Sequence, residues 1–149
     1  MTTVSLQDWL KFGWVRTHRT SQQEIADLLA VADRDLEACQ TTGLVADWRF
    51  NIAYNAALQL ATAALAASGY QAERSNHHFR VIQSLEFTVG ADAKTVRKFD
   101  LFRKKRNITD YERAETVSDL EAEEMRSLAV SLRSSVRAWI TKNCPEYAP

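Results

Sequence analysis

A run of basic residues in the second half of the chain is the feature best suited to chemistry. Seven of the thirteen residues from 94 to 106 are lysine or arginine, the side chains that most often bind phosphate groups. Basic residues also coat solvated helix faces and complement helix dipoles, and this structural role accounts for most of these charges. The residues that we expect to contact phosphate or RNA are Arg103, Lys104, Lys105, Arg106 and Asn107.

Arg106 differs from its basic neighbours because it continues an apolar stripe. Phe99, Phe102 and Arg106 are spaced i, i+3 and i+7, so they share one face of a helix. A guanidinium on an apolar face needs a partner, since an unpaired buried charge is costly. Asp110, four residues further on, could be that partner; the functional alternative is a phosphate group bound by both arms of the guanidinium.

Two adjacent histidines, His77 and His78, precede another apolar pattern and could supply a general base near neutral pH. Adjacent histidines at a helix start are more often capping or packing residues. Neither has a carboxylate at the helical spacing of a zinc site, and no phosphate-binding loop or hydrolase motif occurs. We therefore predict no metal site and no cofactor.

The segments that must position these residues are predicted to be helical. The chain has only four glycines and two prolines in 149 residues, which favours long helices over a sheet. Ser21 and Ser118 each precede a glutamate by three residues, the pattern of a capping box at a helix start. Gly13 and Gly69 are predicted to end helices. We expect helices over residues 5–12, 21–39, 45–68, 76–89, 93–110 and 118–144, and no strand; residues 86–89 are the only strand candidate.

The predicted fold is all-α, an antiparallel up-and-down four-helix bundle with a short extra N-terminal helix. Residues 1–20 form an N-terminal extension, 21–144 a single bundle and 145–149 a C-terminal tail. No signal pattern or uncharged run of about 18 residues is present, so we expect no membrane contact. Cys39 and Cys144 are expected to be reduced thiols in a cytoplasmic protein. The net charge is zero, so any nucleic-acid binding must come from local clustering.

The helix order and several residues resemble the HEPN (higher eukaryote and prokaryote nucleotide-binding) domain family. The resemblance covers residues 21–143. It is carried by the alanine-rich segment with Tyr54 and Asn55, by Gly69-Tyr70, by His77-His78 and by Arg106-Asn107-x-x-x-Tyr111. It implies a helical bundle that dimerises and brings two Arg-x4-6-His motifs into one cleft. Many such proteins are metal-independent ribonucleases, and many are encoded with a minimal nucleotidyltransferase as a toxin–antitoxin pair.

The sequence departs from the family where the motif histidine would stand, because Tyr111 occupies that position. Tyrosine has a reference pKa of about 10 and is a poor base near neutral pH. Arg106 could still stabilise phosphate charge, and Tyr111 could bond a phosphate or stack on a base. The resemblance thus makes Arg106 and Tyr111 the candidate catalytic pair, with Asp110, His77 and His78 as auxiliary residues.

Three functions remain open from the sequence. The first is a HEPN-like homodimer that binds RNA or a nucleotide in a toxin–antitoxin-like or stress-response module, with a nucleotidyltransferase antitoxin as its partner. The second is a noncatalytic helical interaction module, suggested by the missing histidine and by Trp9, Trp14 and Trp139 outside the central apolar stripe. The third is a metal-independent endoribonuclease that uses His77 or His78. The missing histidine favours a protein that is not an enzyme.

Overall fold

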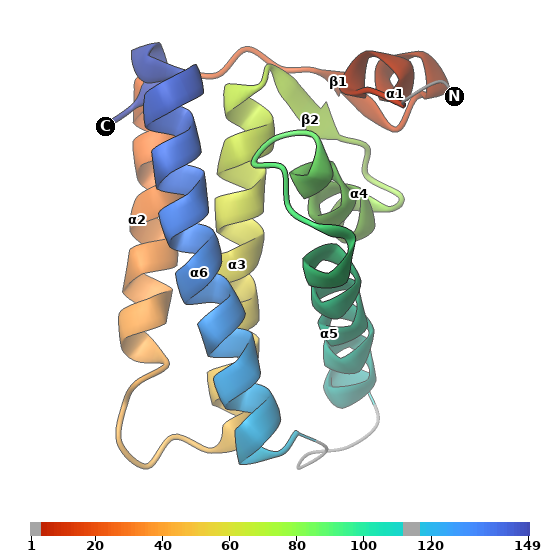
Figure 1. The fold of residues 1–149 in the computed structure, drawn as a ribbon. Coiled ribbons are helices and arrows are strands. Elements are labelled where there is room, and N and C mark those ends of the chain that lie inside the picture. Colours follow the sequence, from red (N-terminus) through yellow and green to blue (C-terminus); the bar gives the residue numbers. More distant parts are fainter. Residues whose placement is uncertain (1–3, 112–116) are drawn as a thin grey trace.

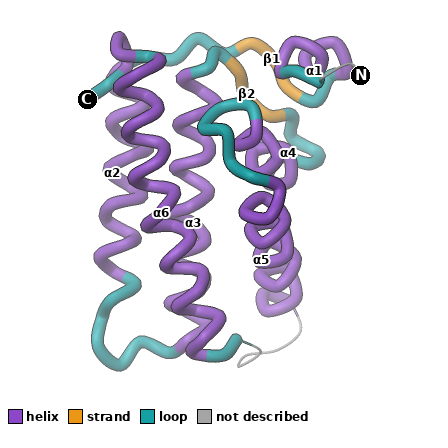
Figure 2. The backbone as a smooth tube through the Cα atoms, in the orientation of Figure 1, coloured by secondary structure: helices purple, strands orange, loops and turns teal. Residues whose placement is uncertain are grey.

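Long helices dominate the computed structural model, which describes residues 4–111 and 117–149, without the side chains of residues 107–111 (Figure 1). This confirms the predicted all-α class. Figure 2 shows that a single pair of short strands interrupts the helices in the described part of the chain. The elements are α1 (Leu6–Phe12), β1 (Val15–Thr17), α2 (Gln22–Ala38), α3 (Ala46–Ala67), β2 (Tyr70–Ala72), α4 (His77–Gln83), the 3-10 turn η1 (Ser84–Glu86), α5 (Ala93–Tyr111), α6 (Asp119–Asn143) and the 3-10 turn η2 (Pro145–Tyr147).

The four long helices alternate in direction along the chain. In Figure 1, α2 and α5 run downwards while α3 and α6 run upwards. Helix α3 packs against α2, α5 and α6, and its alanines allow these neighbours to approach closely. The result is a core centred on α3, in which Phe50, Tyr54 and Leu60 have no exposed surface. The broad apolar face predicted for this helix is therefore confirmed.

The predicted helix ends agree with the structure at three positions. Ser118 and Glu121 form the complete capping box at the start of α6, with both reciprocal bonds present. Gly13 and Gly69 follow α1 and α3 with positive φ angles of 78° and 94°, a conformation that glycine adopts without strain. Ser21 forms only half of its predicted box: its hydroxyl accepts from the Glu24 backbone N–H, but the Glu24 carboxylate bonds elsewhere.

The helix predicted over residues 76–89 is wrong at its C-terminal end. Helix α4 stops at Gln83, and the chain tightens into η1 instead of continuing to Val89. The Ser84 hydroxyl donates to the Val81 carbonyl oxygen at 2.6 Å, so a buried serine bonds back to the helix where the pattern changes. Residues 86–89 form no strand either.

The prediction that the chain has no strand is also wrong. Strands β1 and β2 pair antiparallel, with Val15 opposite Ala72 and Thr17 opposite Tyr70. Each strand has three residues, which is too short to show an alternating pattern in the sequence. This pairing attaches the N-terminal segment to the end of α3.

Aromatic packing fastens the same N-terminal segment to α4. The Arg80 guanidinium carbon lies 3.8 Å from the centroid of the Trp14 ring and 5.5 Å from that of Trp9. Trp9 is buried, and its ring meets Trp14 and Phe87 edge to face. These two tryptophans are therefore used inside the chain, although the sequence suggested them as contacts for a partner.

Two further predictions concern the oxidation state of the cysteines and contact with a membrane. Cys39 and Cys144 are both buried free thiols, in agreement with the predicted reduced state. Within the described residues, no helix combines the length and the apolar character that crossing a membrane requires.

Candidate functional site

Most charges of the basic run on α5 are paired within the chain. Arg103 Nε lies 2.7 Å from Asp100 Oδ1, and Lys104 Nζ lies 3.6 Å from the other oxygen of the same carboxylate. Lys105 Nζ lies 3.4 Å from Glu121 Oε2 across the interface between α5 and α6. Three of the five predicted phosphate contacts, Arg103, Lys104 and Lys105, are thus already paired with a carboxylate. Lys105 in particular joins two helices.

Arg106 faces the core side of α5, as its position in the apolar stripe predicts. Its guanidinium carbon lies 5.0 Å from the centroid of the Tyr54 ring on α3. The same stripe places Phe99 against Tyr54 and Phe102 against Phe50, both edge to face. Arg106 therefore stacks on a buried aromatic ring between two helices, where its charge acts on the groups that surround Tyr54.

Tyr54 also joins Arg106 to His78. The Tyr54 hydroxyl oxygen lies 3.2 Å from His78 Nδ1. Burial raises the pKa of Tyr54 to about 12, so its phenol stays protonated at neutral pH. Burial, followed by the positive charge of Arg106, lowers the pKa of His78, so its imidazole is neutral. A neutral imidazole is the form that can accept a proton.

A surface pocket of about 340 Å3 opens beside this pair, and we call it the cationic pocket. Its side chains come from the β2–α4 connection, the start of α4 and the middle of α5. Arg103 enters it across Phe79, with the guanidinium carbon 5.5 Å from the ring centroid. The lining residues are Arg74, Ser75, Asn76, His77, His78, Phe79 and Arg103.

The structure brings together some predicted site residues and separates others. Arg103, His77 and His78 line the cationic pocket, and Arg106 reaches His78 through Tyr54. Lys104 and Lys105 do not line it. The backbones of Asn107, Asp110 and Tyr111 belong to the last turns of α5, but their side chains lie outside the described residues. The predicted pair of Arg106 with Asp110 or Tyr111 therefore stays a prediction.

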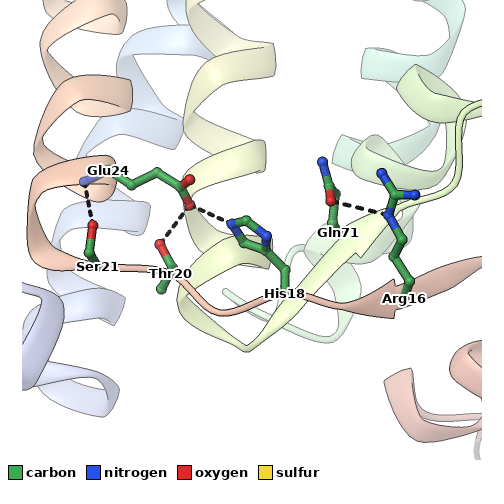
Figure 3. A network of polar contacts seen from close by, with 6 residues as sticks. All are labelled: Arg16, His18, Thr20, Ser21, Glu24 and Gln71. Atoms are coloured by element: carbon green, nitrogen blue, oxygen red, sulfur yellow. Dashed lines mark hydrogen bonds and ion pairs between the residues drawn. The ribbon is translucent and has the colours of Figure 1, made fainter.

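The sequence did not single out two parts of this region. Arg74 enters the cationic pocket from a loop, where no periodic pattern marks it. The second part is a polar network on the N-terminal connector, shown in Figure 3. His18 Nε2 and the Thr20 hydroxyl both lie 2.7 Å from Glu24 Oε1. The bond from Thr20 and the contact with His18 lower the pKa of Glu24, against a smaller opposing effect of burial.

The network of His18, Thr20 and Glu24 could not be predicted from the spacing of these residues in the sequence. Pairing of β1 with β2 sets the position of His18, whose backbone N–H donates to the Gly69 carbonyl oxygen at 2.9 Å. The sequence motif at Ser21 indicated only a helix cap for Glu24.

No group of three or more His, Cys, Asp or Glu side chains suited to a metal ion occurs among the described residues. Comparison of the chain with protein-family models, with curated proteins and with solved structures finds no match.

Proposed function

We propose that this chain is a HEPN-like protein that binds the phosphate groups of RNA or a nucleotide in the cationic pocket. The observation that carries the proposal is the convergence of Arg74, Arg103, His77 and His78 on one surface pocket. Arginine binds phosphate through a planar fork of N–H donors, and imidazole can add a further donor. The proposal keeps Arg103 as a phosphate contact and replaces Lys104 and Lys105 by Arg74, His77 and His78.

The proposed oligomeric state, cellular module and partner follow from the resemblance to the HEPN family. The alternating directions of α2, α3, α5 and α6 suit a HEPN-like four-helix bundle. On this proposal the chain forms a homodimer in a cytoplasmic toxin–antitoxin-like or stress-response module. A minimal nucleotidyltransferase is the proposed partner.

Arg103 and Lys104 offer a matched test of the phosphate site. Both are cations on α5 and both contact Asp100, but only Arg103 lines the cationic pocket. We would measure fluorescence anisotropy of a short labelled RNA with wild type, Arg103→Gln and Lys104→Gln, in EDTA. Arg103→Gln is expected to weaken binding about tenfold or more, since charged hydrogen bonds contribute roughly 1.5–3 kcal/mol. Equal effects of the two variants would contradict the assignment.

A metal-independent ribonuclease is a second candidate, favoured by the neutral imidazole of His78 beside the charge of Arg106. Cleavage in this case persists in EDTA, disappears in His78→Ala and remains in His77→Ala. The same RNA samples, separated on a gel, distinguish a nuclease from a binding protein.

An interaction module is a third candidate, favoured by exposed apolar side chains at one end of the bundle. Trp48 is 62% exposed, and Leu120 is 68% exposed. An ion pair between their neighbours Arg49 and Asp119 holds the starts of α3 and α6 together. Trp48→Ser would then change the oligomeric state in light scattering and leave RNA affinity unchanged, whereas an unchanged mass would exclude Trp48 from a dimer interface.

A further inference from the structure

The hydrogen bond between Tyr54 and His78 has a definite direction. The Tyr54 hydroxyl oxygen lies 3.2 Å from His78 Nδ1, which is its only hydrogen-bond partner among the described residues. Tyr54 has no exposed surface, so its hydroxyl proton cannot be donated to bulk water. A buried donor without an acceptor is costly. The hydroxyl therefore donates to His78 Nδ1, and this nitrogen carries a lone pair and no proton.

The side chains around the Tyr54 ring support this direction. The guanidinium carbon of Arg106 lies 5.0 Å from the ring centroid, and a guanidinium has only donors, so it cannot accept the hydroxyl proton. Its positive charge favours loss of that proton, which makes the hydroxyl a better donor. Phe99, which meets the ring edge to face, has no oxygen or nitrogen acceptor in its side chain.

The other ring nitrogen of His78 is open to solvent. Nε2 makes no hydrogen bond with the described residues. Some described side-chain atoms are buried without a partner, but His78 Nε2 is not one of them, so it has accessible surface. Because Nδ1 faces Tyr54 in the interior, the Nε2 edge is the part of the ring that lines the cationic pocket. A neutral imidazole carries its proton on one nitrogen, and with Nδ1 unprotonated this nitrogen is Nε2.

We infer that Tyr54 holds His78 in the tautomer with its proton on Nε2, and that this N–H donates a hydrogen bond to a phosphate oxygen in the cationic pocket. Tyr54 is a positioning residue, since it does not itself line the pocket. His78 adds a donor beside Arg74 and Arg103 without adding a charge. The role of the donor rests on the proposed function, because the pocket must accept a phosphate group. The tautomer does not depend on it.

The same tautomer bears on the choice between binding and cleavage. A general base must present a lone pair to the ribose 2′-hydroxyl. In this tautomer the lone pair of His78 lies on Nδ1 and accepts the Tyr54 hydroxyl, so the accessible nitrogen can donate but not accept. The opposite tautomer would leave the buried Tyr54 proton without an acceptor. His78 is therefore suited to binding a phosphate group and not to activating RNA for cleavage.

The contact also fastens α4 to α3, and this packing role needs no particular tautomer. Either direction of the hydrogen bond would join the two helices. Its direction is set by the buried Tyr54 proton, and the consequence appears at the far side of the imidazole, where the pocket lies.

Long-range 1H–15N NMR spectra of the free protein test the tautomer, because protonated and unprotonated ring nitrogens resonate in separate ranges. The spectra are recorded at pH 8, where His78 is neutral since burial and the charge of Arg106 lower its pKa. We expect the form with the proton on Nε2 to exceed the other about tenfold or more. Tyr54→Phe should reduce this ratio about threefold or more. Tyr70→Phe is the control, because the Tyr70 hydroxyl bonds no described residue.

Fluorescence anisotropy of a short labelled RNA in EDTA tests the donor. His78→Gln keeps an N–H donor but supplies no base near neutral pH, whereas His78→Ala keeps neither. We expect His78→Gln to bind RNA within about threefold of wild type, and His78→Ala to bind about tenfold more weakly. Melting curves of each variant check that the fold is retained.

The possible outcomes separate this inference from the proposed function. A proton on Nδ1 in the free protein overturns the inference whether or not RNA binds. Binding by His78→Gln that is as weak as binding by His78→Ala overturns the donor role. RNA cleavage that disappears in His78→Gln also overturns it, because cleavage requires a lone pair on Nε2. Wild-type protein with the proton on Nε2 that binds no RNA overturns the proposed function and the donor role, and leaves only the tautomer set by Tyr54.

Discussion

Tyr54 is the residue through which α3, α4 and α5 contact one another around the candidate site. Its ring receives Arg106 and Phe99, and its hydroxyl bonds His78. Tyr54→Phe keeps the ring and removes only the hydroxyl. We expect the free energy of unfolding to fall by roughly 1 kcal/mol, the usual contribution of one hydrogen bond.

Urea denaturation measures this change, and Tyr70→Phe is the matched control because no hydrogen bond to its hydroxyl occurs among the described residues. The same loss in both variants would mean that the Tyr54–His78 contact contributes nothing.

The titration of His78 gives a second prediction at this scale. Burial and the charge of Arg106 lower its pKa from the ordinary value of about 6.5. The unfolded chain then binds this proton more readily than the folded chain, so stability falls as the pH drops below about 6.5.

Imidazole NMR resonances should show His78 titrating below the ordinary range. Arg106→Gln should raise its pKa, because one cause of the lowering is removed. A downward shift in that variant would show that Arg106 acts on His78 by some route other than charge.

At the scale of whole helices, one carboxylate joins α2 to α6. Asp33 Oδ1 lies 2.6 Å from Arg133 Nε, and Oδ2 lies 2.8 Å from Arg137 Nη2. The Arg133 bond, followed by the charge of Arg137, lowers the pKa of Asp33. Its contribution to stability is present above the ordinary aspartate pKa of about 3.9 and is lost as the pH falls through the lowered value.

Asp33→Asn should therefore cost up to about 1 kcal/mol at pH 7, a modest amount because the pair is partly exposed. It should also reduce the loss of stability between neutral and strongly acidic pH. Thermal unfolding at several pH values measures both effects. Asp27→Asn on the same helix is the control, since the Asp27 side chain bonds only Gln23 among the described residues.

Sequence reasoning was most accurate for the helices that carry a cap and a periodic apolar face. Ser118 with Glu121 located the start of α6, and Gly69 located the end of α3, because these signals are local. It failed for β1 and β2, whose three residues each are held by a partner more than fifty positions away. The early end of α4 followed from a buried serine that bonds its own helix, which apolar spacing does not reveal.

At the scale of the whole molecule, the sequence identified the basic run but not which of its members face a pocket. Periodicity correctly placed Arg106 on the apolar face of α5. Arg103 pairs with Asp100 on its own helix, but Lys105 pairs with Glu121 on α6. The basic run alone therefore does not predict which of its side chains are paired with a carboxylate. His18 and Glu24 were missed because strand pairing sets the position of the histidine.

Several basic side chains of α5 are paired with carboxylates inside the chain. We therefore predict a weak salt dependence of RNA binding. Arg74 and Arg103 are the arginines that line the cationic pocket. Two phosphate contacts with a single strand give a slope of about −1.4 for log affinity against log salt. Four contacts from Arg103 to Arg106 would give about −2.8. Anisotropy at four salt concentrations distinguishes the two, and the steeper slope would return the site to the full basic run.

The strand pair has a consequence for how the chain assembles during synthesis. Residues 15–17 are synthesised more than fifty residues before their partners at 70–72. By then all of α2 and α3 has been produced, and the two helices can pack as an antiparallel pair. Residues 15–17 therefore stay unpaired until α3 and residues 70–72 have been made, and their pairing then attaches the N-terminal segment to the end of α3.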